Sequence, residues 1–297
     1  MNTDMFERML SGKGFIAALD QSGGSTPKAL KLYGIDESQY KNEAEMFDLI
    51  HEMRSRIIQS PVFNSKRILA VILFEMTMNR MIDGVGTAEY LWKQKGIVPF
   101  LKVDNGLMPE EDGVQLMRPI PELESRVASG VKHQVFGTKM RSVIKDANPI
   151  GIEKIVQQQF DFARKILAGG LIPIIEPEVD IKSMSKEACE ELLLDSLTKH
   201  LNTLPHNLRV LLKLTIPNKV NLYEPLTKHP SVVRVAALSG GYTRHFAVVE
   251  LEKHKGLIAS FSRALTEGLS VDQSESEFNE TLDGAIEMIF KASTEKH

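Results

Sequence analysis

The chain of 297 residues is 42% hydrophobic and 25% charged, which is ordinary for a globular protein and sufficient for one large core or for two domains. A net charge of −3 gives no indication of a nucleic-acid partner or an anionic membrane, and no uninterrupted apolar run approaches membrane-spanning length. The N-terminal residues do not resemble a signal peptide, and the single Cys189 excludes a disulfide framework within the chain. We therefore expect a cytoplasmic protein.

Short, mostly apolar runs bounded by turn formers predict eight buried strands, at residues 14–20, 67–75, 97–104, 135–143, 171–176, 208–214, 232–238 and 256–261. Helix-like patterns alternate with them, at residues 1–12, 27–33, 40–58, 87–95, 109–129, 150–168, 186–204, 224–229, 242–254 and 263–297. This alternation predicts an α/β fold with a parallel sheet, in the form of a (β/α)8 TIM barrel. The alternative is an open doubly wound sheet, although no GxGxxG follows the first strand. We expect one domain over residues 1–297, with a short N-terminal lead-in and a helical C-terminal tail.

Charged side chains stand at or just beyond the carboxyl ends of most of these strands, namely Asp20, Lys102, Asp104, Lys139, Arg141, Glu176, Glu178, Lys213 and Arg263. In a (β/α)8 barrel these ends meet at one mouth, where the chemistry takes place. Residues two apart share one side of a strand, so Glu176 and Glu178 face the same way, as do Lys139 and Arg141. One charged strand end is usually a solvated rim residue, but this many predict a catalytic site. Because unpaired charges there would be costly, we expect acids and bases to alternate.

The run at residues 208–214 places Lys213 in an almost wholly apolar strand. Burial disfavours an ammonium and should lower the pKa of Lys213 toward neutrality, and a second cation nearby, for which Lys139 is the candidate, would lower it further. A neutral amine can attack a carbonyl and form a Schiff base. From this run alone, the alternative is a structural lysine whose stem packs on the core while its ammonium reaches water.

Two adjacent loops predict a phosphate site. The turn Ser239-Gly240-Gly241 follows the seventh strand, and Ser260 and Arg263 lie at the end of the eighth, where this fold often binds phosphate through backbone N–H groups. Ser-Gly-Gly alone is more often a plain turn, but its combination with Arg263 favours phosphate binding. Ser22 and Ser25, after the first strand, either serve similarly or form only a tight turn.

A metal site is not expected. The eight histidines form no HxH or HxxxH pair, and the sequence has no Cys/His cluster that could hold zinc. The predicted chemistry therefore depends on the charged side chains alone.

Motifs along nearly the whole chain, in order on successive strands, are highly specific when taken together. They are Gly12-Lys13-Gly14, Ala18-Leu19-Asp20-Gln21-Ser22, Leu101-Lys102-Val103-Asp104, Thr138-Lys139-Met140-Arg141, Ile175-Glu176-Pro177-Glu178, Leu211-Leu212-Lys213, Leu238-Ser239-Gly240-Gly241 and Phe261-Ser262-Arg263-Ala264-Leu265. Through these motifs the chain resembles the class I, Schiff-base fructose-1,6-bisphosphate aldolases in their shorter bacterial form. The resemblance implies reversible cleavage of fructose 1,6-bisphosphate to glycerone phosphate and glyceraldehyde 3-phosphate in glycolysis and gluconeogenesis. It also implies that the enzyme needs no metal or other cofactor and takes sugar phosphates as ligands.

The same resemblance implies a role for each motif residue. Lys213 would form the Schiff base with C2 of the ketose, Glu176 would be its acid/base group, and Glu178 and Lys139 would support the proton transfers. Asp20 would act at the C3–C4 bond. Phosphate ligands complete the expected site, with Ser239, Gly240, Ser260 and Arg263 at the C1 phosphate and Lys102 and Arg141 approaching the far phosphate.

Three features depart from the family pattern. Residues 293–297 lack the terminal tyrosine of the animal and plant enzymes, Gln-Ser-Gly-Gly-Ser follows Asp20 where Glu-Ser-Thr-Gly-Ser is commoner, and Leu214-Thr215 follows Lys213 where Pro-Asn is expected. None of them changes the charged set.

Other functions remain as alternatives. One is another lysine-dependent barrel enzyme, such as a transaldolase, a deoxyribose-phosphate aldolase or a tagatose-bisphosphate aldolase. Another is a catalytically idle barrel that serves as a scaffold. The two phosphate sites argue against a transaldolase or a deoxyribose-phosphate aldolase, and the presence of both Lys213 and Lys139 argues against the scaffold. The sequence leaves open the configuration required at C4 and whether the protein is a homo-oligomer.

Overall fold

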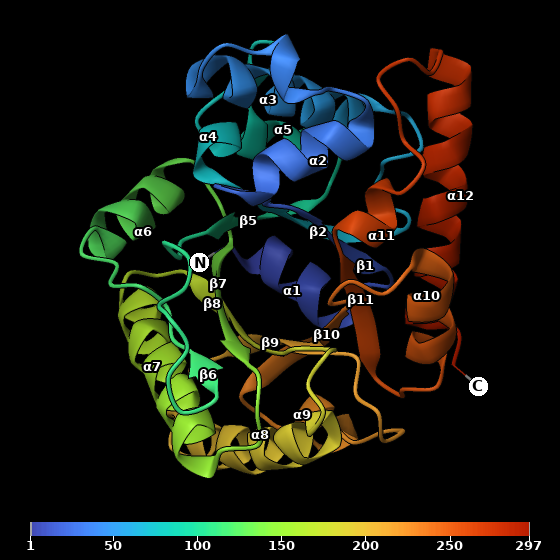
Figure 1. The fold of residues 1–297 in the computed structure, drawn as a ribbon. Helices are drawn as coiled ribbons and strands as arrows, with labels where there is room; N and C mark the ends of the chain where they lie inside the picture. Colours follow the sequence, from blue (N-terminus) through green and yellow to red (C-terminus); the bar gives the residue numbers. More distant parts are fainter. Residues whose placement is uncertain (1, 297) are drawn as a thin grey trace.

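The computed structural model describes residues 2–296, and its main feature is a closed barrel of eight parallel strands (Figure 1). The barrel strands are β1 (Phe15–Leu19), β2 (Ile68–Leu73), β5 (Val98–Lys102), β7 (Gly137–Ile144), β8 (Ile172–Val179), β9 (Val210–Thr215), β10 (Val232–Leu238) and β11 (Leu257–Phe261). Each corresponds to one of the eight predicted strands. Neighbours pair in chain order, β1 also pairs with β11, and the pairing of β5 with β7 completes the ring. Closure confirms the (β/α)8 barrel and excludes the open doubly wound sheet.

Helices surround the barrel because the strands are largely apolar and buried on both faces, so that they need a cover on the outside. In chain order the surrounding helices are α2 (Ser25–Tyr33), α3 (Glu43–Gln59), α4 (Glu75–Met78), α5 (Thr87–Lys93), α6 (Leu123–Lys132), α7 (Pro149–Ala168), α8 (Lys186–Leu201), α9 (Glu224–Thr227), α10 (Arg244–Glu252), α11 (Arg263–Thr266) and α12 (Glu275–Thr294). Further short elements are a 3-10 turn, η1 (Glu37–Gln39), and a hairpin of β3 (Met81–Ile82) and β4 (Val85–Gly86).

Helix α7 illustrates how local sequence and packing agree. Asn148 caps its start by accepting hydrogen bonds from backbone N–H groups of the first turn, and Pro149 stands where its missing N–H costs nothing. Ile152, Phe160 and Ile166 are fully buried along one side of the helix. Each such side chain contributes about 1.5–3 kcal/mol by its burial.

The N-terminal helix α1 (Thr3–Ser11) closes the amino-terminal end of the barrel. Figure 1 shows it within the ring of strands, and Met5 and Met9 are buried in the same apolar cluster as residues of β1, β2 and β5. Arg234 of β10 donates hydrogen bonds of 2.7 Å to the carbonyl oxygens of Met9 and Gly12. The open end of the barrel is therefore the one that carries the carboxyl ends of the strands.

Two predicted helical regions differ from the structure. Within residues 109–129, the chain first turns at Gly113 (φ 70°) and forms β6 (Val114–Gln115), antiparallel to β7, and α6 begins only at Leu123. Pro119 and Pro121, which lack N–H donors, keep the helix from starting earlier.

The C-terminal region is two helices rather than one. Gly268 (φ 87°) interrupts it after α11, and a capping box of Ser274 and Glu277 starts α12. No helix among residues 2–296 combines the length and the apolar character needed to cross a bilayer. The assignment of the whole chain to one domain stays a prediction.

Candidate active site

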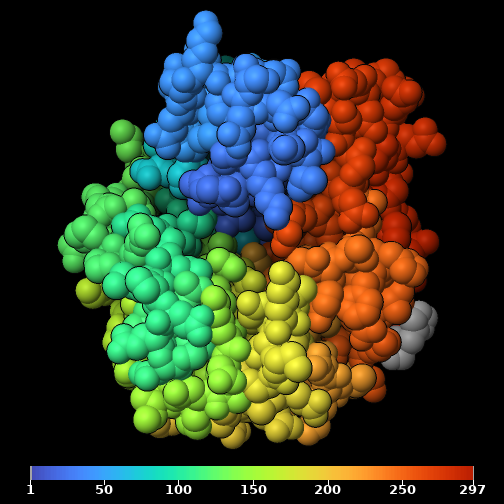
Figure 2. All heavy atoms as spheres, viewed as in Figure 1, coloured from blue at the N-terminus to red at the C-terminus, as the bar shows by residue number. Residues whose placement is uncertain are grey.

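A cavity of about 490 Å³ opens at the carboxyl ends of the barrel strands. Figure 2 shows it as a hollow near the centre of the open face, between the N-terminal (blue), green, yellow and orange segments. Its lining includes every residue that the sequence predicted for the site, namely Asp20, Ser22, Ser25, Lys102, Lys139, Arg141, Glu176, Glu178, Lys213, Ser239, Gly240, Ser260 and Arg263. These residues come from most of the strands of the barrel, so the structure brings the whole predicted set together.

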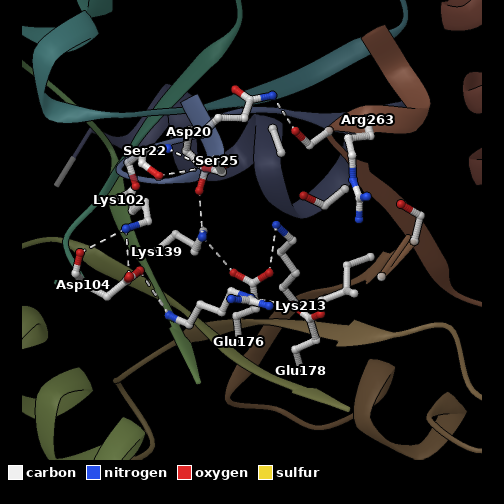
Figure 3. Close-up of a pocket in the computed structure, with 18 of the residues that line it drawn as sticks. Asp20, Ser22, Ser25, Lys102, Asp104, Lys139, Glu176, Glu178, Lys213 and Arg263 are labelled. Carbon is white, nitrogen blue, oxygen red and sulfur yellow. Dashed lines mark hydrogen bonds and ion pairs between the residues drawn. The ribbon is translucent and has the colours of Figure 1, made fainter. Parts of the chain in front are cut away.

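The centre of the cavity is a chain of alternating charges (Figure 3). Lys139 Nζ lies 2.6 Å from Asp20 Oδ2 and 3.0 Å from Glu176 Oε2, and Lys213 Nζ lies 3.1 Å from Glu176 Oε1. All four side chains are buried, with 3% of Lys139 and 5% of Lys213 exposed. The second cation expected beside Lys213 is thus present, and both lysines share the carboxylate of Glu176.

The electrostatics of this chain favour the charged forms of Asp20 and Lys139. Burial alone would raise the pKa of Asp20, but the ammonium groups of Lys139 and Lys213 outweigh it and hold that pKa well below its usual range. Burial alone would lower the pKa of Lys139, but the carboxylates of Asp20 and Glu176 raise it well above its ordinary value. Asp20 and Lys139 therefore remain an ion pair over the whole neutral range.

A second pair of interactions lies toward the rim. Arg141 Nε is 2.5 Å from Glu178 Oε2, and Lys102 Nζ is 2.8 Å from Asp104 Oδ1. Glu178 is the main reason why the pKa of Arg141 stays above its usual value despite burial. The alternation of acids and bases that the sequence predicted is confirmed, with Glu178 next to a rim arginine.

The loops after β10 and β11 meet on one side of the cavity. Gly240 and Gly241 have φ values of 59° and 119°, which other residues rarely adopt, and a Cβ at Gly241 would lie 3.2 Å from Arg263 Nη2. The Oγ atom of Ser260 is buried and has no hydrogen-bond partner among the described residues. A buried, unpaired hydroxyl and a guanidinium that line the same cavity are suited to an anionic ligand.

On the other side, Ser22 and Ser25 form the turn that starts α2. The backbone N–H of Ser22 donates to Ser25 Oγ at 2.9 Å, and Ser25 Oγ donates to the carbonyl oxygen of Ser22 at 2.8 Å. Both residues line the cavity, so the two interpretations of this segment hold together: it is a tight turn, and it faces the site.

Sequence reasoning missed several residues around the cavity. Asp104 received no role, yet its carboxylate also accepts hydrogen bonds from the backbone N–H groups of Gly106 and Arg141. Gln21 and Ser262, which line the cavity, were only neighbours of predicted residues. Arg54 lies behind Gln21 on the surrounding helix α3, where no motif or spacing indicates a link to the site.

Within residues 2–296, no three His, Cys, Asp or Glu side chains are grouped so that they could hold a metal ion. The chemistry that the arrangement supports is that of a buried amine between proton donors and acceptors.

Sequence comparisons point to one family. A family model for class-I fructose-bisphosphate aldolase matches residues 5–223. The chain is 58% identical over 293 residues to fructose-bisphosphate aldolase class 1 of Clostridium acetobutylicum, with 99% of each chain covered. It is 56% identical over 292 residues to the protein of the same name from Synechocystis sp., with 98% of this chain and 97% of the relative covered.

Structural comparisons agree on the fold. Fructose-bisphosphate aldolase from Plasmodium falciparum, solved in complex with TRAP and a small-molecule inhibitor, has a TM-score of 0.71 at 20% identity and covers 99% of this chain and 94% of its own. Cgl0159 from Corynebacterium glutamicum has a TM-score of 0.55 at 13% identity, with 98% and 92% covered. At these identities the likeness establishes the fold alone.

Proposed function

The chain belongs to the class I fructose-bisphosphate aldolase family, and from that premise we propose how its own residues perform the reaction. It is a lyase that reversibly cleaves fructose 1,6-bisphosphate to glycerone phosphate and glyceraldehyde 3-phosphate. Enzymes of this class form a covalent imine with a lysine and use no metal ion. The assignment of individual residues, and of the setting in which the enzyme works, is the content of the proposal.

Lys213 is the nucleophile. Lys213 first passes its ammonium proton to Glu176. The neutral amine then adds to C2 of the ketose to give a carbinolamine, whose hydroxyl takes that proton from Glu176 and leaves as water, so that an iminium remains. The support is the distance of 3.1 Å between Lys213 Nζ and Glu176 Oε1 in a buried setting. This contact is the single observation that carries the assignment.

Asp20 acts on the carbon skeleton, and Lys139 supports it. Asp20 accepts the proton of the C4 hydroxyl, the C3–C4 bonding electrons move into the iminium, and glyceraldehyde 3-phosphate leaves an enamine on Lys213. Protonation of that enamine at C3 and addition of water at C2 then release glycerone phosphate and regenerate the amine. Lys139 and Glu178 support the proton transfers. Lys139 does so by keeping both carboxylates in place through its ion pairs with Asp20 and Glu176, and Glu178 lines the same cavity.

The two phosphates of the substrate bind on opposite sides of Lys213. Ser239, Gly240, Ser260 and Arg263 hold the C1 phosphate, and we add Ser262 from the same loop. Lys102, Arg141, Ser22 and Ser25 hold the far phosphate. In Figure 3, Arg263 lies on one side of Lys213 and Lys102 lies on the other, which supports this division.

The test is cleavage of fructose 1,6-bisphosphate by the purified protein, together with borohydride trapping of the imine in the presence of glycerone phosphate. Peptide mapping must find the reduced adduct on Lys213. Tagatose 1,6-bisphosphate, assayed in parallel, reports the configuration required at C4. An adduct on Lys139 or Lys102, with Lys213 unmodified, would overturn the assignment of the nucleophile.

The proposal extends to the setting of the enzyme. We propose a single-domain, cytoplasmic protein that binds free sugar phosphates and neither nucleic acid nor membrane. The net charge of −3 supports this setting. Cell fractionation tests the location, and light scattering determines whether the protein is a homo-oligomer.

A further inference from the structure

Arg54 is a buried cation without an anionic partner. Its side chain is fully buried although it comes from α3, outside the barrel. The guanidinium donates to Thr77 Oγ1 at 2.7 Å, to the Gln21 carbonyl oxygen at 2.6 Å and to Gln21 Oε1 at 3.2 Å. These acceptors are neutral, and no carboxylate within residues 2–296 forms an ion pair with it. Since an unpaired buried charge is costly, its presence behind the active site calls for a functional reason.

The guanidinium sets the direction of a hydrogen-bond chain that reaches the cavity. Arginine can only donate, so the side-chain oxygen of Gln21 must face Arg54 and its amide NH2 must face the other way. That NH2 group donates to Ser262 Oγ at 2.6 Å. Ser262 is therefore an acceptor in this chain and keeps its own hydroxyl proton to donate elsewhere.

Ser262 is placed where such a donor matters. It lines the cavity, precedes Arg263 in the chain and stands at the start of α11. Phosphate oxygens only accept hydrogen bonds when the phosphate is a dianion. If the Ser262 hydroxyl pointed its proton at residue 21, it would present only its lone pairs to these phosphate oxygens.

We propose that Arg54 is a positioning residue for the C1 phosphate, because it fixes Gln21 as a donor to Ser262 and so leaves the Ser262 hydroxyl proton free for the substrate. This inference rests on the proposed function, and it adds a residue that does not touch the substrate. It also explains why a neutral glutamine suits position 21. A glutamate there would take the Ser262 proton as an acceptor and cancel the charge of Arg54.

The charge of Arg54 persists at neutral pH. Burial lowers the pKa of its guanidinium to about 10, while the carboxylate of Asp20 acts in the opposite direction. Arg54 therefore remains donor-only under working conditions.

The experiment compares two ligands that differ by one phosphate. Glycerone phosphate and glycerone are titrated against the protein with borohydride, and the concentration that gives half-maximal trapping is measured for each. A residue that acts through the phosphate changes the ratio of the two concentrations, whereas general damage to the fold or to Lys213 changes both alike. The variants are Gln21→Glu, Gln21→Leu, Arg54→Lys and Arg54→Met, with Gln94→Glu as a control for added charge on an exposed helix end.

We expect Gln21→Glu and Arg54→Met to raise the half-maximal concentration of glycerone phosphate about tenfold, which corresponds to the loss of roughly one charge-assisted hydrogen bond. The half-maximal concentration of glycerone should change less than twofold. Gln21→Leu, which adds no charge, should show a smaller loss of the same kind. Arg54→Lys should change the ratio of the two concentrations only slightly, and Gln94→Glu should leave it as in the wild type.

An unchanged ratio in Gln21→Glu, or equal losses for both ligands, would overturn the role of Arg54. Gln21 is half-buried, so its variants decide the question even where Arg54→Met fails to fold. Failure of the wild-type protein to form any adduct on Lys213 would instead refute the proposed function, which keeps the two outcomes distinct.

Discussion

Lys213 Nζ lies 3.1 Å from one carboxylate oxygen of Glu176 in the floor of the cavity. The other oxygen of that carboxylate lies 3.0 Å from Lys139 Nζ. Glu176 can therefore exchange a proton with the group that Lys213 attacks without losing its second contact. The first two predictions follow from this arrangement.

Lys213→Ala should abolish both the borohydride adduct and cleavage, and should leave the melting temperature within a few degrees of wild type. The methylene stem and the ammonium of one cavity-lining side chain are lost, while the rest of the buried strand β9 remains. Mass spectrometry of reduced protein and a thermal melt provide the two measurements. The control Lys219→Ala, which removes an exposed lysine that pairs with Glu191, should form the borohydride-reduced adduct as the wild type does.

Glu176→Gln should lower kcat about 10²- to 10⁴-fold with a much smaller change in KM, because a general acid/base is removed while shape and hydrogen bonding are kept. Steady-state kinetics with fructose 1,6-bisphosphate measure both constants. Glu191→Gln, on the exposed side of α8, is the matched control. A Glu176→Gln enzyme with normal kcat would assign the proton transfers to another group.

Arg263→Ala should weaken binding of glycerone phosphate about 10- to 100-fold, since a charge-assisted hydrogen bond contributes roughly 1.5–3 kcal/mol. Trapping by glycerone, which has no phosphate, should change little. Arg164→Ala, at an exposed position of α7, provides the control. Equal losses for both ligands would mean that Arg263 supports the structure and does not grip phosphate.

Chelation should not reduce activity. In this class the iminium takes up the electrons of the broken bond, the task that a bound metal performs as a Lewis acid in metal-dependent catalysis. The measurement is cleavage after prolonged dialysis against EDTA, compared with an untreated sample. Loss of activity that zinc restores would contradict the imine mechanism.

The folded state should lose stability as pH falls below neutrality, in part through His254. Burial, with the ammonium of Lys296, lowers the pKa of His254 from 6.5 to about 4, and its Nδ1 accepts a hydrogen bond from the backbone N–H of Asn221. Because the folded pKa is the lower one, the unfolded chain binds the extra proton between these values, and stability rises with pH across that window. His254 therefore contributes its full stabilisation above pH 6.5 and loses it progressively toward pH 4.

Urea unfolding at pH 7.5 and pH 5.5 measures this effect. Wild type should lose about 1 kcal/mol more than His254→Gln between the two pH values. The glutamine can still accept a hydrogen bond and does not titrate, so a similar loss in both proteins would assign the pH dependence to other groups.

The sequence by itself determined the order and type of the main elements and the set of polar residues that line the cavity. Runs such as residues 210–215 are mostly apolar, and this local pattern is sufficient to predict a strand that is buried on both faces. Strand ends carry the chemistry in this fold, so Lys213 and Glu176 could be singled out from their positions along the chain. The local pattern failed to predict the two interruptions of helical regions, where the backbone turns at Gly113 and Gly268.

The tertiary structure alone decided which charges meet. Arg141 stands opposite Glu176 in the register of β7 and β8, yet its guanidinium pairs with Glu178, and Lys139 bridges Asp20 and Glu176. Arg54 reaches Gln21 from a surrounding helix through a contact that no short-range pattern encodes. Such pairings depend on the relative shift of neighbouring strands and on the reach of long side chains into one shared cavity. Both are set only when the barrel closes, because closure brings residues distant in the chain within a few ångströms of each other.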